Sequence, residues 1–593
     1  MVARFFLFLG SMVTLATVSS TATASDEAGI LVRLAEANDL VIEARLAGDE
    51  TGAYVRGMPR TFSTHLLFGA LAHADANSRW HRSSRVLELM ERDAAALGAL
   101  QREGGLFDEG NLDSPPDSAF VVSALCKMLR LLDRDESSDT EGLRHAIAEI
   151  VRRATPGLLE GGVHTPNHRW HLAATLAEIH ALHPDPRLPV RIDEWLAEGI
   201  DIDPDGFYGE RSPHYSAEVV NPALVELGHA LERKDLLDVV RRNLEASLAL
   251  IEPNGEVEAV FSRRQDQREG VRKYLADNFF AYRFFATKDG DGRWAALARR
   301  IERDQFDLVA RNQRNPNAAF PLLALFREAA GELPADVALP ESFVHHYAHN
   351  GIVRIRKGTT TTTINGASDA ASGLGFGSGL AMNPTFLRFR RGAAVLDGVR
   401  LVPQFFSTGF FYPWGVDRIE GGWRLRELRR VPYYLPLPPE SRRADGDYTL
   451  GADGRFFAKM EFDRRPVHTV DLEIRVDVRE REDGGFDLDF DVDGRADVPV
   501  TIELSFREGG VLEGVDRLDS GGPEFAGAFA LRRGDGRYRV GEDEIVFGPG
   551  SFEGPPVRGE HESVRWVNGS MRAVGQRVYV TLRTPVRYTM TLR

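Results

Sequence analysis

The period of the hydrophobic residues changes past the middle of the chain, and this change limits the folds open to it. From Glu27 to about Glu332, apolar residues recur with the spacing of amphipathic helices. From about Phe343 they alternate with polar residues in short segments rich in β-branched side chains, which is typical of strands. The sequence therefore predicts a multidomain α plus β protein. We expect a helical domain over residues 25–335 and a large antiparallel β-sandwich over residues 342–593.

The helical part offers roughly twelve candidate helices, joined by connections that are marked with Gly and Pro. Consecutive antiparallel hairpins of this kind favour a complete or incomplete (α/α)6 toroid, with alternate helices inside and outside. In such a ring every second helix points the same way. Four of these same-facing helices are predicted to start with a hydroxyl or amide residue followed by proline, at Ser114-Pro115, Thr165-Pro166, Ser212-Pro213 and Asn315-Pro316.

Two of these helix starts carry side chains that suit acid–base chemistry. Asn167 and His168 open the helix that starts at Pro166, and Tyr215 lies in the first turn of the helix that starts at Pro213. A helix N-terminus has unpaired N–H groups and partial positive charge, so it favours anions. An amide, an imidazole and a phenol at such positions indicate an enzyme that acts on an acidic substrate.

Further charged residues are expected at the same end of the toroid. Asp117 lies in the first turn of the helix that follows Ser114. The loop from Glu252 to Asp266 precedes another same-facing helix and carries Arg263 and Arg264. Because N-termini of parallel helices gather at one end of a ring, these groups are predicted to meet there although they are far apart in sequence.

The N-terminal residues have the features of a secretory signal peptide. Arg4 supplies positive charge, an apolar stretch runs from Phe5 to Val18, and Ala22-Thr23-Ala24 fits a cleavage site. This stretch is too short and too poorly flanked for a stable membrane span. We expect residues 1–24 to be removed and the mature protein to be secreted or periplasmic, without membrane attachment. An uncleaved anchor is the alternative.

Composition excludes several classes of partner and cofactor. The net charge of −15 argues against binding nucleic acid or an anionic membrane through bulk electrostatics. Cys126 is the single cysteine, so an intrachain disulfide and a thiolate metal cluster are excluded. His164, His168 and His171 have a spacing that metal ligands can share, but no flanking carboxylate pattern supports a zinc site. We therefore expect neither a metal nor a cofactor.

The motifs TPNHRW, with Asn167 and His168, and GERSPHY, with Tyr215, resemble those of polysaccharide lyases of the heparinase II/III and alginate lyase type. The resemblance covers nearly the whole mature chain in architecture and implies an α/α toroid followed by an antiparallel β domain. It also implies that Asn167 neutralises a uronate carboxylate, while His168 and Tyr215 handle protons. Many relatives carry a further His in the β domain, but the comparable segment Ile364–Ser372 has none.

The chemistry that these residues can perform is β-elimination at a uronate. Asn167 can hydrogen bond to the carboxylate, a neutral His168 can accept a proton, and Tyr215 can donate one to the departing oxygen. Which of the two is the base depends on the configuration of the substrate. We expect the anionic polysaccharide to contact a set of candidate binding residues: Asp117, Trp170, Arg211, Arg263, Arg264 and His349. His345 and His346 lie beside His349 and can substitute for the missing β-domain His.

Two other functions stay open at this point. A glycoside hydrolase on the same toroid needs two carboxylates, and Asp117, Glu210 and Asp205 are available for that role. A non-catalytic glycan-binding protein is the second alternative, and the missing β-domain His supports it. The aromatic run from Phe405 to Trp414 is open to two interpretations, core packing or sugar stacking at the domain boundary.

Overall fold

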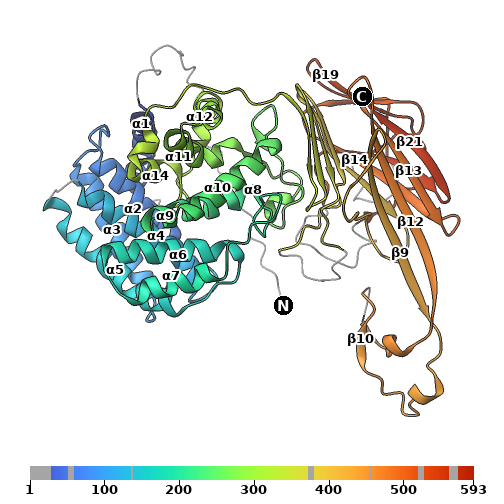
Figure 1. Ribbon diagram of the computed structural model, residues 1–593, viewed down its shortest axis with the longest axis horizontal. Coiled ribbons are helices and arrows are strands. Elements are labelled where there is room, and N and C mark those ends of the chain that lie inside the picture. The colour runs from blue at the N-terminus through green and yellow to red at the C-terminus, as the bar shows by residue number, and fades with distance from the viewer. Residues whose placement is uncertain are drawn as a thin grey trace.

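Helices fill the first half of the protein and strands fill the second, which confirms the predicted α plus β fold class. Figure 1 shows the helical part and the β part side by side, joined by an extended segment between residues 331 and 341. The computed structural model describes residues 29–50, 59–134, 138–370, 379–454, 457–518, 527–559 and 572–593. The predicted signal peptide, residues 1–24, lies outside the described residues. Within the described ranges, no helix has both the length and the apolar character of a membrane span.

The helical part is built from α-helices joined by short turns and 3₁₀ segments. Several of these helices are apolar around most of their circumference, as expected for helices buried inside a larger domain. Their bounds are α1 (Ile30–Glu50), α2 (Pro59–Ala74), α3 (Ser84–Leu100), α4 (Pro115–Asp133), α5 (Glu141–Glu160), α6 (Pro166–Leu182), α7 (Arg187–Ala197), α8 (Pro213–Tyr215), α9 (Asn221–Ala230), α10 (Lys234–Ser247), α11 (Phe279–Asp289), α12 (Gly292–Asp304), α13 (Phe306–Arg311) and α14 (Ala319–Leu325).

The helices pack in a closed circuit of contacts. α2 packs on α4, α4 on α6, α6 on α9, α9 on α11, α11 on α14, and α14 returns to α2. A second group lies against these helices, with α3, α5, α7, α10 and α12 each packed on one member of the circuit. The toroid of alternating inner and outer helices stays a prediction. Figure 1 shows α8 on the side of the helical part that faces the β part.

Two predicted helix starts are wrong. The helix expected at Pro316 begins at Ala319, because the Asn315 side chain accepts the backbone N–H of Asn317 at 3.0 Å and forms a turn. The helix expected near residue 270 begins at Phe279. The residues before it form a short hairpin of β1 (Glu256–Val257) and β2 (Lys273–Tyr274), followed by the 3₁₀ segment η5 (Leu275–Asn278).

The β part contains two large sheets. One has nine strands in the order β16-β17-β20-β14-β7-β6-β5-β4-β3, and the other has eight in the order β15-β18-β19-β21-β13-β12-β9-β8. β17 and β20 pair in parallel, and the other pairs among the described strands are antiparallel. The bounds are β3 (Ser342–Tyr347), β4 (Ile352–Lys357), β5 (Thr360–Asn365), β6 (Leu387–Arg391), β7 (Ala394–Pro403), β8 (Asp417–Ile419), β9 (Gly422–Tyr434), β10 (Leu450–Ala452), β11 (Phe457–Lys459), β12 (Val467–Glu480), β13 (Phe486–Gly494), β14 (Pro499–Phe506), β15 (Val511–Glu513), β16 (Asp516–Arg517), β17 (Phe529–Ala530), β18 (Gly536–Val540), β19 (Asp543–Gly548), β20 (Gln576–Arg583) and β21 (Val586–Leu592).

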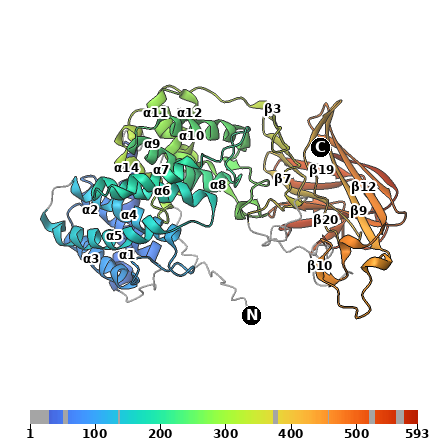
Figure 2. The same ribbon diagram turned by 60° about the horizontal axis from the view of Figure 1, so that its bottom comes forward.

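The nine-stranded sheet is covered on both faces. Val353 and Ile355 of β4 point into the apolar core that the two sheets share. Arg354, between them in the sequence, points to the opposite face, because successive side chains alternate along a strand. There it contacts Glu252 of the helical part at 2.7 Å. Figure 2 shows this sheet lying between the helices and the outer sheet, so the molecule has three layers.

The interface between the two parts is formed by charges of opposite sign. A loop of the helical part, Glu252–Glu269, supplies glutamates, and the facing side of the nine-stranded sheet supplies arginines. The ion pairs are Glu252–Arg354 at 2.7 Å, Glu256–Arg390 at 2.7 Å, Glu256–Arg507 at 2.8 Å, Glu258–Arg388 at 2.6 Å and Glu269–Arg400 at 2.6 Å. Most of these side chains are buried. The loop that holds Arg263 and Arg264 is therefore fixed between the two parts.

Candidate active site

The structure brings Asp117, His168 and Tyr215 together, although they come from α4, α6 and α8. His168 is close enough to Asp117 and Arg264 for their charges to act on its pKa. Arg60, at the start of α2, is likewise close to Asp117 and Tyr215. Each of these helices has a proline in its first turn, so the same local arrangement presents a polar side chain at the same end of the circuit.

The predicted helix caps form at two of the four positions, Ser114 and Ser212. The Ser114 side chain accepts the N–H of Asp117, and the Ser212 side chain accepts the N–H of Tyr215 at 3.1 Å. Ser212 also donates to Asp266 at 2.8 Å, so the start of α8 is tied to the neighbouring loop. The predicted cap at Thr165 is wrong. Its hydroxyl is buried and has no hydrogen-bond partner among the described residues.

Asn167 is almost completely buried, with 1% of its surface exposed. Its amide nitrogen Nδ2 donates to Oε2 of Glu210 at 2.7 Å. Its carbonyl oxygen Oδ1 has no partner in the described part of the chain. A buried polar atom without a partner is costly, so Oδ1 can accept a hydrogen bond from a ligand donor such as a sugar hydroxyl.

His168 is held in its neutral form. Burial is the largest cause, and the neighbouring His164 and Arg60 act in the same direction, so the pKa of His168 falls to about 3 despite the opposing charge of Asp117. The ring of His164 meets that of His168 edge-on, with the centroids 4.9 Å apart. The Nδ1 atom of His168 is buried and has no hydrogen-bond partner among the described residues. The neutral imidazole offers a lone pair to a proton, although so low a pKa makes it a weak base.

Tyr215 lies beside a guanidinium. Arg264 is stacked on its ring, 4.3 Å from the centroid, and its Nη1 donates to Oε1 of Glu210 at 2.6 Å. The phenol donates to Oε1 of Gln265 at 3.3 Å. Burial raises the pKa of Glu210, and the charge of Arg264 and the N–H of Asn167 oppose this rise. The site therefore joins an amide, an imidazole, a phenol and a cation.

Arg211 and Arg263 lie at the domain interface and bind the protein's own carboxylate. Arg211 donates to Asp369 at 3.1 Å and to the carbonyl of Ala367 at 2.9 Å, and it is buried. Arg263 donates to both oxygens of Asp369 and to the carbonyl of Gly209. Both guanidiniums are thus engaged by Asp369, although Nε of Arg211 is buried without a described partner, and their binding to substrate stays a prediction. Asp369 lies in the segment 364–372, where many of the lyases that the sequence resembles carry a His.

The backbone at Arg211 is unusual. Its φ angle is 48°, in the left-handed region, which costs a non-glycine residue about 1–2 kcal/mol. The bonds of its guanidinium to the β part hold it there. This turn sends Glu210 toward the helical side and Arg211 toward the β side, and the backbone carbonyl of Glu210 accepts the N–H of Arg263 at 2.9 Å.

Three other predicted residues lie in different surroundings. Trp170 has no exposed surface, and its indole N–H donates to Asp201 at 3.3 Å, so the prediction that it contacts a polysaccharide is wrong. Asp117 is paired with the guanidinium of Arg60 and accepts from Asn111 at 2.9 Å. His349 is exposed in the turn between β3 and β4, at the boundary where the next residue contacts the helical part.

The aromatic run divides between the two interpretations. Phe405, Phe410 and Phe411 are buried and pack in the β part. Trp414 is 66% exposed and forms a β-bridge with Ala367, the residue whose carbonyl binds Arg211. Its indole therefore lies at the boundary of the two parts, where it can stack on a sugar ring.

Sequence reasoning missed Arg60 as a candidate site residue and weighed Glu210 only as the carboxylate of a hydrolase. Arg60 pairs with Asp117, and its guanidinium lies 4.2 Å from the ring centroid of Phe120. One signal was available for Arg60. Pro59 precedes it at the start of α2, as proline does in α4, α6 and α8. Glu210 lies in a loop, and no pattern in its neighbours indicates that it bridges Asn167 and Arg264.

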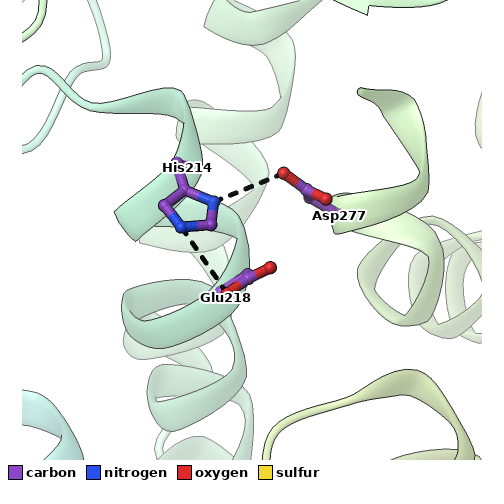
Figure 3. A group of neighbouring side chains, drawn as sticks. All are labelled: His214, Glu218 and Asp277. Carbon is purple, nitrogen blue, oxygen red and sulfur yellow. Dashed lines mark hydrogen bonds and ion pairs between the residues drawn. The ribbon is translucent and has the colours of Figure 1, made fainter. Parts of the chain in front are cut away.

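The histidines of the helical part do not form the zinc site that was weighed. His171 stacks on Phe120 at 3.8 Å between ring centroids and contacts Asn317 through Nδ1. A different group, His214, Glu218 and Asp277, has the composition of a metal site (Figure 3). However, Nδ1 of His214 faces Asp277 at 3.4 Å and Nε2 faces Glu218 at 3.7 Å. One ion cannot bind both ring nitrogens.

This arrangement fits a protonated imidazole held between two carboxylates. Burial lowers the pKa of His214, but Asp277 and Glu218 more than offset the effect, so its pKa lies above the ordinary value. The ring of His214 lies edge-on to that of Tyr215, with centroids 5.4 Å apart. The group therefore supports the segment that carries Tyr215.

No family model and no curated protein sequence matches the chain. Among solved structures it is similar to the chondroitin AC lyase of Streptomyces coelicolor A3 in complex with chondroitin sulphate, with a TM-score of 0.53 and 15% identity over 98% of this chain and 81% of that one. A mutant of the same lyase gives a TM-score of 0.51 at the same identity and coverage. Heparinase III gives 0.49 at 13% identity, over 89% of this chain and 75% of that one.

These similarities define the class of fold. The chain has the fold of polysaccharide lyases with a helical domain and a β domain, and the likeness extends over nearly its whole length. The resemblance inferred from the sequence is thus confirmed at the level of the fold.

Proposed function

We propose that the protein is a polysaccharide lyase that cleaves a uronate-containing polysaccharide by β-elimination, without a metal. The observation that carries this proposal is the grouping of Asn167, His168, Tyr215 and Arg264 at one end of a lyase fold. Arg264 and the amide of Asn167 offer N–H donors to the carboxylate whose neighbouring C–H becomes acidic. Neutral His168 and the phenol of Tyr215 can remove one proton and donate another.

The similar solved structure is named as a chondroitin AC lyase in complex with chondroitin sulphate. An acidic polysaccharide of this kind also suits the site described above. Arg60 and Arg264 place two positive charges beside Tyr215. The exposed indole of Trp414 can add a stacking surface at the domain boundary. Secretion or export to the periplasm, which residues 1–24 predict, suits an enzyme whose substrate is a polymer outside the cell.

The hydrolase alternative is weaker. A glycosidase needs a carboxylic acid that can donate its proton and a second free carboxylate. Here Asp117 is paired with Arg60, and Glu210 is paired with Arg264. Hydrogen bonds from Ser114 and Asn111 and the charge of Arg60 lower the pKa of Asp117 despite burial, so Asp117 is not suited to act as the general acid. Burial leaves the pKa of Glu210 raised, but its two oxygens are engaged by Asn167 and Arg264, so these two residues do not supply both the acid and the free carboxylate that hydrolysis needs.

The proposal is tested with purified protein on a panel of uronate polymers, including chondroitin, hyaluronan, heparan sulfate, alginate and glucuronan. Each β-elimination creates a carbon–carbon double bond conjugated to the carboxylate, which absorbs ultraviolet light. We expect absorbance to rise with at least one polymer, and Tyr215→Phe to reduce the rate by about 10²–10⁴-fold because the proton donor is lost. Asn167→Ala should also reduce it strongly.

The other outcomes have distinct meanings. New reducing ends without absorbance indicate hydrolysis. Binding of a polymer without either product indicates a glycan-binding protein. The required control is the melting temperature of Tyr215→Phe, which should be close to that of the wild type. A loss of activity through unfolding would carry no information about the site.

A further inference from the structure

Glu210 is a carboxylate that contacts two of the candidate site residues at once, Asn167 and Arg264. It is 7% exposed and lies in the loop before α8. Its Oε2 accepts from Nδ2 of Asn167 at 2.7 Å, and its Oε1 accepts from Nη1 of Arg264 at 2.6 Å. Because Arg264 is stacked on Tyr215, Glu210 links the amide of α6 to the phenol of α8.

The bond to Glu210 fixes which end of the Asn167 amide faces the substrate. An ionised carboxylate has acceptors only, so it holds Nδ2 and excludes Oδ1, which would place two oxygens in contact. The amide nitrogen carries a second N–H, and Arg264 has N–H groups beyond the one that Glu210 binds. These N–H groups can donate to an anion. Because Glu210 binds both side chains, its carboxylate sets the distance between the amide and the guanidinium.

We propose that Glu210 is a positioning residue of this site, which holds the amide of Asn167 and the guanidinium of Arg264 so that both can donate to one substrate carboxylate. This inference rests on the proposed lyase function. Glu210 itself does not touch the reacting atoms. Its charge also offsets that of Arg264, so the pair attracts an anion less strongly than an unpaired guanidinium would.

The proposal predicts a loss of kcat without a rise of KM. Glu210→Gln removes a negative charge and one acceptor while it keeps the size of the side chain. We expect kcat to fall at least tenfold, because the amide of Asn167 loses its fixed orientation. KM should stay the same or fall, because the uncompensated charge of Arg264 attracts the anionic polymer more strongly. A raised KM with unchanged kcat would overturn the proposal.

A double-mutant cycle separates positioning from general damage. If Glu210 acts through Asn167, then adding Glu210→Gln to Asn167→Ala should change kcat by less than the tenfold expected in the wild-type background. Independent, multiplying effects would overturn the proposal. Glu269→Gln is the matched control, because Glu269 is also a buried glutamate paired with an arginine, Arg400, but lies at the domain interface. It should change stability without the tenfold loss of kcat.

A crystal structure of Glu210→Gln tests the inference without relying on activity. We expect the amide of Asn167 or the guanidinium of Arg264 to move from its place in the wild type. If both stay in place, the inference is wrong whatever the enzyme does. If wild-type protein forms no unsaturated product, the proposed function fails, and this structure still decides whether Glu210 positions the two groups. Glu210→Asp, which keeps the charge but is shorter, serves if the glutamine variant does not fold, and should retain only one of the two contacts.

Discussion

His168 shows how the surroundings of a single residue decide its chemical form. A histidine in water is partly protonated near neutral pH, and a protonated ring cannot act as a base. Burial, His164 and Arg60 together keep this ring neutral to a pKa of about 3. The sequence placed His168 at a helix N-terminus, which acts in the same direction. The structure adds burial, which is the larger effect.

This lowered pKa has a consequence for stability. Between pH 6.5 and about 3, the unfolded chain binds a proton at this position and the folded protein does not. The free energy of unfolding should therefore decrease as pH falls through this window, by about 1.4 kcal/mol per pH unit, and the contribution is complete above pH 6.5. His168→Gln should show a shallower dependence in urea unfolding at pH 6.5, 5.5 and 4.5. Equal slopes for both proteins would contradict the shifted pKa.

At this scale the sequence predicts the residues that a helix start positions, and misses those that tertiary contacts position. Asn167 and Tyr215 follow from a proline at the first helical position. The partners of Arg211 and Trp170 do not follow from any local pattern. Arg211 binds Asp369, which is distant in sequence, and Trp170 binds Asp201, which lies outside its own helix. Arginine in particular binds whichever carboxylate the fold brings near, whether it belongs to a substrate or to the protein.

The start of α8 illustrates how one cap positions an element. Ser212 bonds the N–H of Tyr215 and also binds Asp266. Ser212→Ala should destabilise the protein by about 1 kcal/mol and reduce activity, because Tyr215 loses its fixed start of helix. Thr165→Ala is the matched control and should cost less, because Thr165 has the same position in α6 without a cap bond. Thermal melts and initial rates of both variants check this, and equal losses would count against it.

Three helices of the circuit are joined by a buried ionic cluster. Lys127 of α4 has no exposed surface and contacts Glu178 of α6 at 3.1 Å and Glu226 of α9 at 2.8 Å. Ser123 adds a hydroxyl that accepts from Lys127 at 2.7 Å and donates to Glu178 at 2.8 Å. Burial raises the pKa of Glu226 to about 7, against the opposing charge of Lys127.

Removal of the lysine should be severe. Lys127→Met leaves two carboxylates buried side by side, which costs about 3–5 kcal/mol of unfolding free energy. Adding Glu178→Gln and Glu226→Gln should recover most of this loss, because the uncompensated charges are gone. Chemical denaturation of the single and triple variants measures both effects. A single variant as stable as the wild type would show that the cluster does not hold the helices together.

At the level of elements, apolar period and proline predicted most helices to within a few residues. The exceptions have physical causes. Near residue 316 a side-chain turn delays α14, and before α11 the chain forms the acidic loop that binds the β part. A loop whose glutamates are buried by pairing with another domain has no local signal of that role, because glutamate is ordinarily an exposed residue.

The whole molecule is held together at this acidic loop. Glu258 is buried and binds Arg388 at 2.6 Å and also pairs with Arg354. Burial alone would raise its pKa, but the two arginines and a bond from Thr363 hold it at about 2. The carboxylate therefore stays ionised at ordinary pH.

Breaking this contact should affect the entire protein. Glu258→Ala removes the carboxylate that pairs with Arg388 and one of the two that pair with Arg354, and it should lower the free energy of unfolding by about 3–5 kcal/mol. Glu149→Ala is the control, because Glu149 and Arg152 form an exposed pair within α5 that should contribute little. Urea unfolding followed by a helix signal and by a strand signal gives the comparison. An equal effect of both substitutions would contradict a shared interface.

The charge pairing of this interface also has a practical consequence for anyone who divides the chain. A truncated product that contains only the strands would present Arg354, Arg388, Arg390, Arg400 and Arg507 to solvent without their glutamates. Such a strip of guanidiniums attracts any polyanion, including nucleic acids from the expression host. Retention of that fragment on a heparin column would thus be an artefact of cutting, and glycan affinity is meaningful only for the undivided protein.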